Sequence, residues 1–358
     1  MSAPVLIMAG GTGGHVFPGL AVADALRAHA VPVTWLGARG GMEEDLVQRH
    51  QLPFEAIEVQ RLRGKGLLRW MAAPFQIVRA VSQALRVLRR LRPRSVLALG
   101  GFAAGPGGLA AWLMRVPLVV HEQNRIPGLT NKVLMRLAKR RLCGLDGPFA
   151  RRVGATAVGN PVREQILNTP APVERGLAGD GKRRLLILGG SQGARFLNQN
   201  LPKALAMIEP QRRPSVLHQC GARNLQATVE AYADAGVTAD VQEFIADMAA
   251  SYCNAELAVC RSGALTVAEL AAVGLPSLLV PFPFAVDDHQ TANAQWLVDA
   301  NAAELMPEDQ TQVPDLAKRI DALLNNPEKL QAMAVAARAL APLGAAQKVA
   351  ETCMEVAR

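Results

Sequence analysis

A glycine-rich turn occurs twice in this chain of 358 residues, and the two copies lie half the chain apart. The first, residues 10–14, reads GGTGG, and the second, residues 189–193, reads GGSQG. Each follows a short apolar run and precedes a segment whose apolar residues have helical spacing. Both are typical of the strand–turn–helix start of an α/β unit, where glycines let main-chain amides and a helix N-terminus approach a phosphate.

Short aliphatic runs alternate with helical stretches along the rest of both halves. The expected strands of the first half are Val5–Ala9, Val33–Leu36, Val96–Leu99, Leu118–Val120, Arg141–Cys143 and Thr156–Val158. Those of the second are Leu185–Leu188, Ser215–His218, Val241–Phe244, Leu257–Cys260, Ser277–Val280 and Ala303–Leu305. This alternation predicts an α/β chain with two Rossmann-like, doubly wound parallel-sheet domains that bind ligands at the carboxyl ends of their strands.

The junction between the domains is expected at residues 159–163, because Pro161 restricts the residue before it and stops a strand from continuing. The first domain would then span residues 1–162 and the second residues 163–343. A last helix, residues 344–358, could pack on either. No apolar stretch approaches the ~20 residues of a membrane span and the first residues resemble no signal peptide, so we expect a cytosolic protein.

The net charge of +9 is unevenly distributed along the chain. Residues 1–160 hold 22 Lys and Arg against 8 Asp and Glu, and ten basic residues without one acid fall between Arg61 and Arg94, among many apolar side chains. Such a segment suits an anionic bilayer surface. A solvated surface helix packed on its own core explains it equally well. Nucleic acid is a poor partner for a chain with 4% aromatic residues and no recognised binding motif.

The glycine turns do not match the common cofactor motifs. Val16 stands where a dinucleotide fingerprint needs its third glycine, and Arg39 follows the second expected strand in place of an acid. Neither turn has the lysine of an ATPase phosphate loop. No spacing of acidic residues, histidines or cysteines supports a metal site. We predict no cofactor and no metal.

Four other features are candidates for function. His15 follows the first turn, where a helix N-terminus favours the neutral ring that can accept a proton, although an ordinary helix-start histidine fits as well. Residues 100–106 form a third glycine turn, and residues 121–124 (HEQN) end a strand with four polar side chains, which favours a ligand. The pattern of residues 260–269 predicts the end of a strand, a turn and the N-terminus of a helix, where a diphosphate could bind. Glu269 in this segment either binds a ribose diol or merely complements the helix dipole.

Together these segments resemble the MurG family of bacterial UDP-N-acetylglucosamine:lipid I N-acetylglucosaminyltransferases, two-domain enzymes of the GT-B fold. The resemblance covers essentially the whole chain, and its motifs lie at residues 10–15, 100–106, 121–124, 159–163, 189–194 and 261–269. It implies two domains facing across a cleft, with the last helix returning to the first. The reaction implied is inverting transfer of N-acetylglucosamine to the 4-hydroxyl of the muramyl sugar of lipid I, giving lipid II.

The resemblance also implies roles for particular residues. Ile245 would meet uracil, Glu269 the ribose, and Ala264–Thr266 the diphosphate. The full set implied for the UDP-sugar is Arg163, Ser191, Ile245, Ala264, Leu265, Thr266, Val267, Ala268, Glu269 and Gln290, and for the sugar and acceptor region Thr12, Gly13, Gly14 and Asn124. His15 is the first candidate for the catalytic base and Glu122 the second. One departure is His289, where relatives often carry a glutamine.

The implied partners are UDP-N-acetylglucosamine, undecaprenyl-linked lipid I, the anionic surface of the inner membrane on its cytoplasmic face, and other proteins of cell-wall synthesis and division. Two alternatives remain: a UDP-sugar 2-epimerase, which shares the architecture but needs no lipid acceptor, and a nucleotide-sugar-binding scaffold without chemistry. UDP release that depends on a lipid I analogue separates the transferase from both.

Overall fold

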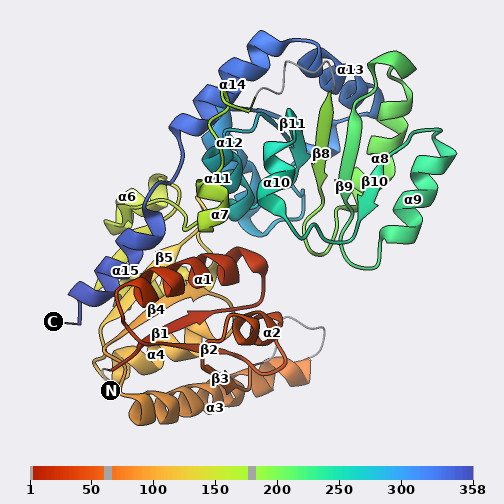
Figure 1. Cartoon of the computed structure of the whole chain (residues 1–358). Helices are drawn as coiled ribbons and strands as arrows, with labels where there is room; N and C mark the ends of the chain where they lie inside the picture. Colours follow the sequence, from red (N-terminus) through yellow and green to blue (C-terminus); the bar gives the residue numbers. More distant parts are fainter. Residues whose placement is uncertain (1–2, 60–66, 176–182, 358) are drawn as a thin grey trace. The chain divides into compact units, whose positions relative to one another are not determined.

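The structure is a computed structural model that describes residues 3–59, 67–175 and 183–357, and only the backbone of residues 67–74 and Val286. The chain divides into two compact units (Figure 1). Unit 1 comprises Met1–Arg163 and Gly344–Arg358, and unit 2 comprises Glu164–Leu343. Arg163, which was expected to open the second domain, belongs to unit 1.

Unit 1 is built on a parallel sheet whose described strands follow the order β3-β2-β1-β4-β5-β6-β7. The strands are β1 (Val5–Ala9), β2 (Val33–Ala38), β3 (Phe54–Ile57), β4 (Ser95–Gly100), β5 (Leu118–Glu122), β6 (Arg140–Cys143) and β7 (Thr156–Ala157). The sequence did not predict β3, a half-exposed edge strand whose apolar pattern is interrupted by Glu55.

Helices cover both faces of this sheet. They are α1 (Gly13–Ala28), α2 (Met42–Arg49), α3 (Leu67–Leu91), α4 (Ala104–Leu113), α5 (Leu129–Leu137), α6 (Pro148–Val153) and α15 (Ala345–Glu355). Because successive side chains of a strand point to opposite faces, Val5 and Ile7 join the core under α1 and α15, whereas Leu6 and Met8 join the core under α3, α4 and α5. The last helix therefore belongs to the core of unit 1.

Unit 2 has a second parallel sheet, with the strand order β10-β9-β8-β11-β12-β13. Its strands are β8 (Arg184–Leu188), β9 (Ser215–Gln219), β10 (Asp240–Gln242), β11 (Leu257–Cys260), β12 (Ser277–Leu279) and β13 (Ala303–Leu305). Its helices are α7 (Glu164–Leu167), α8 (Arg195–Ala206), α9 (Leu225–Asp234), α10 (Met248–Cys253), α11 (Ala264–Val273), α12 (His289–Val298), α13 (Val313–Leu324) and α14 (Pro327–Ala339). Within the described part of this unit, short 3₁₀ helices span Pro210–Arg212, Val286–Asp288 and Glu308–Gln310.

The strand orders place the glycine turns at the topological switch points of both sheets, where the strand order reverses. In unit 1 the order reverses between β1 and β4, which are followed by the first and third glycine turns. In unit 2 it reverses between β8 and β11, which are followed by the second glycine turn and by residues 261–263. Ligands of open parallel sheets bind at such switch points, beyond the carboxyl ends of the strands. The predicted fold class, two doubly wound parallel sheets, is confirmed.

Candidate functional site

A buried carboxylate supports the first glycine turn. Glu43, at the start of α2, is 1% exposed; its Oε2 accepts a hydrogen bond from the Gly11 amide (3.1 Å) and its Oε1 one from the Ala38 amide (3.0 Å). A Cβ at Gly10 would lie 2.3 Å from Glu43 Oε1. The sequence suggested that the amides of this turn meet a phosphate, but the Gly11 amide already binds an anionic side chain. A phosphate here would have to be met by other amides of the turn.

The third glycine turn packs directly on the first. Gly101 has a φ of +89°, and a Cβ there would lie 2.3 Å from the carbonyl oxygen of Gly10. Gly100 has a φ of +126°, and its Cβ would lie 2.8 Å from Cε1 of His15. Both positions therefore need glycine, for their backbone conformation and for the close approach. This turn holds the first turn and the His15 ring in place.

The polar residues at the end of β5 connect to His15. Nδ1 of His15 lies 2.8 Å from Oε1 of Gln123, and Nε2 of Gln123 lies 3.1 Å from Nδ1 of His121. Nε2 of His121 lies 3.0 Å from the carbonyl oxygen of Gly159. Burial lowers the pKa of His121 to about 4, although the hydrogen bond to Gly159 opposes this shift. His121 is therefore neutral at neutral pH. Gln123 belongs to the polar motif at residues 121–124, but the sequence indicated no role for it.

Glu122 is held in a different network. It is 2% exposed; its Oε1 accepts hydrogen bonds from the amide and the Nδ2 of Asn124 (2.9 and 3.0 Å), and its Oε2 accepts one from Nδ2 of Asn131 (2.9 Å). Both oxygens are thus engaged with protein donors. This arrangement favours a structural role for Glu122 and leaves His15 as the stronger candidate for the base.

The remaining predicted residues of unit 1 surround the start of α1. Thr12 is its exposed N-cap, and Gly13 and Gly14 form its first turn, where the amides have no partner within the helix. The guanidinium of Arg163 stacks on the Phe17 ring, 4.8 Å from its centroid. Arg163 thereby joins the group formed by the first turn and His15.

In unit 2, β11 leads through residues 261–263 into α11. Gly263 is the N-cap in an extended conformation, so Ala264, Leu265 and Thr266 present the first-turn amides of a ten-residue helix. The amide of Val267 donates to Gly263 O, and the side chains of Val267 and Ala268 are buried. These last two residues, which were included among the ligand contacts, pack in the core. Residues 264–266 remain the predicted contacts of the diphosphate, because they form the first turn of the helix.

Glu269 follows on the same helix and is 5% exposed. Its Oε2 accepts a hydrogen bond from the hydroxyl of Tyr252 in α10, at 2.9 Å. Tyr252 itself is 1% exposed. Glu269 lies beyond the first turn of α11, which has no acidic residue, so it is not the first-turn acid that the alternative interpretation supposed. Its contact with a ribose stays a prediction. The sequence gave no reason to single out Tyr252.

The second glycine turn rests on neutral groups. A Cβ at Gly193 would lie 2.3 Å from Cys220 O, which accepts a hydrogen bond from Nδ2 of Asn198 (3.0 Å). Oδ1 of Asn198 in turn contacts Nε2 of His218 (3.1 Å), and burial lowers the pKa of His218 to about 3. Ser191, at the tip of the turn, is exposed. The second turn therefore lacks the carboxylate that lies under the first.

Two further predicted contacts lie near the ends of β10 and β12. Ile245 is half-buried beside Phe244, which is exposed. Gln290 is the second residue of α12; its Oε1 accepts a hydrogen bond from the Phe282 amide (3.0 Å), and its carbonyl oxygen accepts one from the hydroxyl of Ser262 (2.8 Å). The side chain of Gln290 is thus held by its oxygen, which leaves Nε2 as the end that can donate to a ligand.

Arg261 is the first residue of the 261–269 motif. Its side chain stabilises a loop of the protein. Its Nη1 donates to the carbonyls of Val280 and Pro281, both at 3.1 Å, and its Nη2 lies 2.5 Å from Oε2 of Glu308. Within the described residues, no group of three or more His, Cys, Asp or Glu side chains is placed to hold a metal ion.

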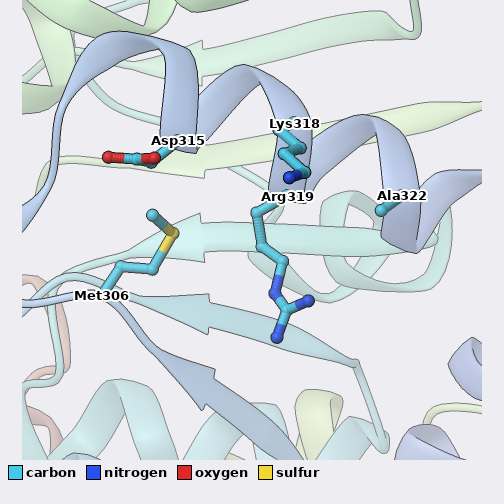
Figure 2. Close-up of a pocket in the computed structure, with 5 residues that line it drawn as sticks. All are labelled: Met306, Asp315, Lys318, Arg319 and Ala322. Atoms are coloured by element: carbon cyan, nitrogen blue, oxygen red, sulfur yellow. The ribbon is translucent and has the colours of Figure 1, made fainter.

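A hollow of about 220 Å³ in unit 2 lies outside this set of residues. Figure 2 shows it between the segment after β13 and α13, and it is lined by Met306, Asp315, Lys318, Arg319 and Ala322. The Nε of Arg319 pairs with Glu304, which also binds Lys329 at 2.6 Å. None of the predicted site residues lines this hollow.

Comparisons with known proteins agree with this arrangement. Residues 5–142 match the glycosyltransferase family 28 N-terminal domain, and residues 184–351 match the corresponding C-terminal domain. A relative from Alkalilimnicola ehrlichii is 54% identical over 100% of both chains, and one from Xanthomonas axonopodis pv. citri is 54% identical over 99% of this chain and 82% of its own. Both are named UDP-N-acetylglucosamine–N-acetylmuramyl-(pentapeptide) pyrophosphoryl-undecaprenol N-acetylglucosamine transferase.

Solved structures give the same result. The crystal structure of Acinetobacter baumannii MurG has a TM-score of 0.83 and 40% identity, covering 99% of this chain and 100% of that one. A UDP-GlcNAc 2-epimerase from Neisseria meningitidis has a TM-score of 0.67 over 98% of this chain and 99% of its own, but at 14% identity it shares only the fold. The chain belongs to glycosyltransferase family 28 and, within it, to the MurG family of N-acetylglucosamine transferases.

Proposed function

We propose that this chain transfers N-acetylglucosamine from UDP-N-acetylglucosamine to the 4-hydroxyl of the muramyl sugar of lipid I, with inversion, and so forms lipid II. The observation that carries the proposal is the 54% identity, over the whole chain, to relatives named for this transfer. The residues that would perform it gather at the switch points of the two sheets, His15 in unit 1 and the start of α11 in unit 2. The product is the test: mass spectrometry should detect lipid I enlarged by one N-acetylhexosamine, and an unchanged lipid would contradict the proposal.

Unit 2 would bind the donor. The amides of residues 264–266 and the dipole of α11 favour a diphosphate, and the carboxylate of Glu269 accepts hydrogen bonds from the ribose hydroxyls. Ile245 would contact uracil, and Ser191 and Nε2 of Gln290 would complete the site. The second glycine turn, with neutral groups beneath it, is better suited to an anion than the first.

We expect Glu269→Ala to weaken the binding of UDP-N-acetylglucosamine about 10- to 100-fold, because hydrogen bonds to a charged group contribute about 1.5–3 kcal/mol. Tyr252→Phe should weaken it less, since it removes only the hydroxyl that orients the carboxylate. Isothermal titration calorimetry measures both. Glu230→Ala, which removes a carboxylate on α9, is the control and should bind like the wild type. If all three variants bound UDP-N-acetylglucosamine with the same affinity, Glu269 would not be part of the donor site.

The reaction would be one displacement at the anomeric carbon. The acceptor oxygen forms a bond to that carbon while the bond to the β-phosphate oxygen breaks, and its electron pair leaves with UDP. The hydroxyl proton passes to His15. The start of α11 and the guanidinium of Arg163 would stabilise the negative charge on the departing UDP, a pre-arranged electrostatic effect that reaches several kcal/mol in enzymes. Thr12, Gly13, Gly14 and Asn124 would position the acceptor.

The proposed membrane surface consists of exposed apolar side chains on α3, α4 and α5. On α3, Val81 and Leu88 lie in the core, as the alternative interpretation of the basic segment expects, but Phe75 is 79% exposed. Trp70, which belongs to the same basic segment and was also expected to meet the membrane, has a side chain outside those that the structure describes. Among the side chains that the structure describes on these three helices, the exposed large apolar ones are Phe75, Ile77, Val78, Trp112, Leu113, Leu129 and Val133. Helix α4 packs against both α3 and α5, so the three helices are neighbours.

Exposed arginines on the same helices, including Arg86, Arg89 and Arg136, would attract an anionic lipid surface. Within the described residues, no helix has the length and apolar character needed to cross a membrane. From the exposed apolar residues and arginines of these helices, we propose peripheral attachment to the cytoplasmic face of the inner membrane, where the lipid-linked acceptor would be met. Contacts with other proteins of cell-wall synthesis remain part of this proposal.

Replacing Phe75 and Leu129 together by serine should lower binding to vesicles that contain anionic lipid by roughly tenfold or more, because each buried large apolar side chain contributes about 1.5–3 kcal/mol. Vesicle co-sedimentation measures the effect. Met207 and Val335 are exposed apolar residues of unit 2, and replacing both by serine is the matched control. Equal binding of both double variants and the wild type would contradict the proposed membrane surface.

A further inference from the structure

Three side chains of unit 1 form one continuous chain of hydrogen bonds. It starts at the carbonyl oxygen of Gly159, 3.0 Å from Nε2 of His121. Nδ1 of His121 is 3.1 Å from Nε2 of Gln123, and Oε1 of Gln123 is 2.8 Å from Nδ1 of His15. Because each contact needs one donor and one acceptor, the chain determines where the protons lie.

The first contact fixes His121. A carbonyl oxygen can only accept, so Nε2 of His121 donates to Gly159. The ring is fully buried and its pKa is lowered to about 4, so it is neutral and its Nδ1 can only accept. The amide nitrogen of Gln123 faces two acceptors, this Nδ1 and the carbonyl oxygen of His121 at 2.9 Å. The orientation of the Gln123 amide follows from these partners, and its Oε1 must point to His15.

The third contact, between Gln123 and His15, fixes His15. An amide oxygen can only accept, so Nδ1 of His15 carries a proton, and the lone pair of the neutral ring lies on Nε2. We propose that Gln123 and His121 are positioning residues that hold His15 as its Nδ1–H tautomer and make Nε2 the atom that takes the proton of the acceptor hydroxyl. This inference rests on the proposed function for the role of Nε2. The proton that reaches Nε2 gives an imidazolium, whose Nδ1–H keeps its bond to Gln123 until the ring releases the proton to solvent.

The fold holds this chain rigidly. Gln123 is 1% exposed, and its main-chain carbonyl accepts a hydrogen bond from Nδ2 of Asn160 at 3.0 Å. On the other side of the His15 ring lies Gly100, where even a methyl group would collide with Cε1. The His15 ring is therefore confined between Gly100 and the Gln123 amide, and the tautomer is set before a substrate arrives.

The test is nuclear magnetic resonance of the full chain labelled with ¹⁵N-histidine, where the nitrogen shifts identify the protonated ring atom. In the wild type, His15 should carry its proton on Nδ1 and His121 on Nε2. Gln123→Met should shift His15 toward the Nε2–H form and lower kcat about 10- to 100-fold, with KM for the donor within about twofold, because general-base catalysis depends on the correct tautomer. His121→Phe should act in the same direction, but less, since one acceptor for the Gln123 amide remains.

Gln347→Met is the matched control, because Gln347 forms another amide–imidazole pair, 2.6 Å from His29 on the surface of unit 1. It should change neither the His15 signals nor kcat. A wild-type His15 protonated on Nε2, or a Gln123→Met variant with unchanged tautomer and unchanged kcat, would overturn the proposal. A wild type with the expected tautomer but no acceptor-dependent transfer would instead contradict the proposed function, so the two failures are distinguishable.

Discussion

His15→Ala is expected to lower kcat by about 10²–10⁴-fold while the affinity for UDP-N-acetylglucosamine stays within about threefold. General-base catalysis contributes an effect of this size, and the donor would bind to unit 2, whereas His15 lies in unit 1. Steady-state kinetics with a lipid I analogue gives kcat, and calorimetry gives the donor affinity.

His29→Ala is the control, because His29 is an exposed histidine at the other end of α1. It should behave like the wild type in both measurements. Unchanged turnover in His15→Ala would show that His15 is not the catalytic base and would leave Glu122 as the candidate. An equal loss of turnover and of donor affinity would place His15 in donor binding.

The largest expected effect on stability comes from Glu43. Glu43→Ala should lower the free energy of unfolding of unit 1 by about 3–5 kcal/mol, because it leaves a cavity and removes the acceptor of the buried Ala38 amide and of the partly buried Gly11 amide. Urea unfolding followed by fluorescence measures this, since the buried Trp35 donates to the carbonyl of Ala9 beside the turn. UDP binding by unit 2 checks that the rest of the variant remains folded.

Glu44→Ala is the matched control for Glu43. Glu44 is the next residue of α2, and its carboxylate accepts a single exposed hydrogen bond from the Gly40 amide, at 2.8 Å. Its loss should cost about 1 kcal/mol or less. If both variants unfolded at the same urea concentration, Glu43 would not be the support of the first glycine turn.

The sequence was sufficient to predict the architecture because the strands are buried on both faces. Val5–Ala9 and Leu257–Cys260 are continuous apolar runs, which is the pattern of interior parallel strands, and the structure has both with the same bounds. The glycine turns then mark the strand ends at the switch points. The edge strand β3 was not predicted, because one face of an edge strand tolerates polar residues and Phe54–Ile57 has no clear pattern.

The site was less predictable, because its important contacts join residues far apart in the sequence. Glu43 lies 32 residues from the glycine whose amide it binds, and Gln123 lies 108 residues from His15. Glu43 begins an ordinary acidic helix turn and has no local signal. The polar motif at residues 121–124 includes Gln123, but nothing near it in the sequence indicates that its partner is His15. Val267 and Ala268 were included because they continue a motif, but the helical periodicity turns their side chains into the core.

The most direct test of the account is the release of UDP from UDP-N-acetylglucosamine by the wild-type protein, with and without a lipid I analogue. A transferase releases UDP at a rate that depends on the acceptor, and the His15→Ala variant should lose that dependence. We predict release that rises to saturation with the lipid I analogue and is near background without it. UDP release that is equal with and without the acceptor, as for a 2-epimerase, or no release under either condition, as for a binding scaffold, would contradict the account.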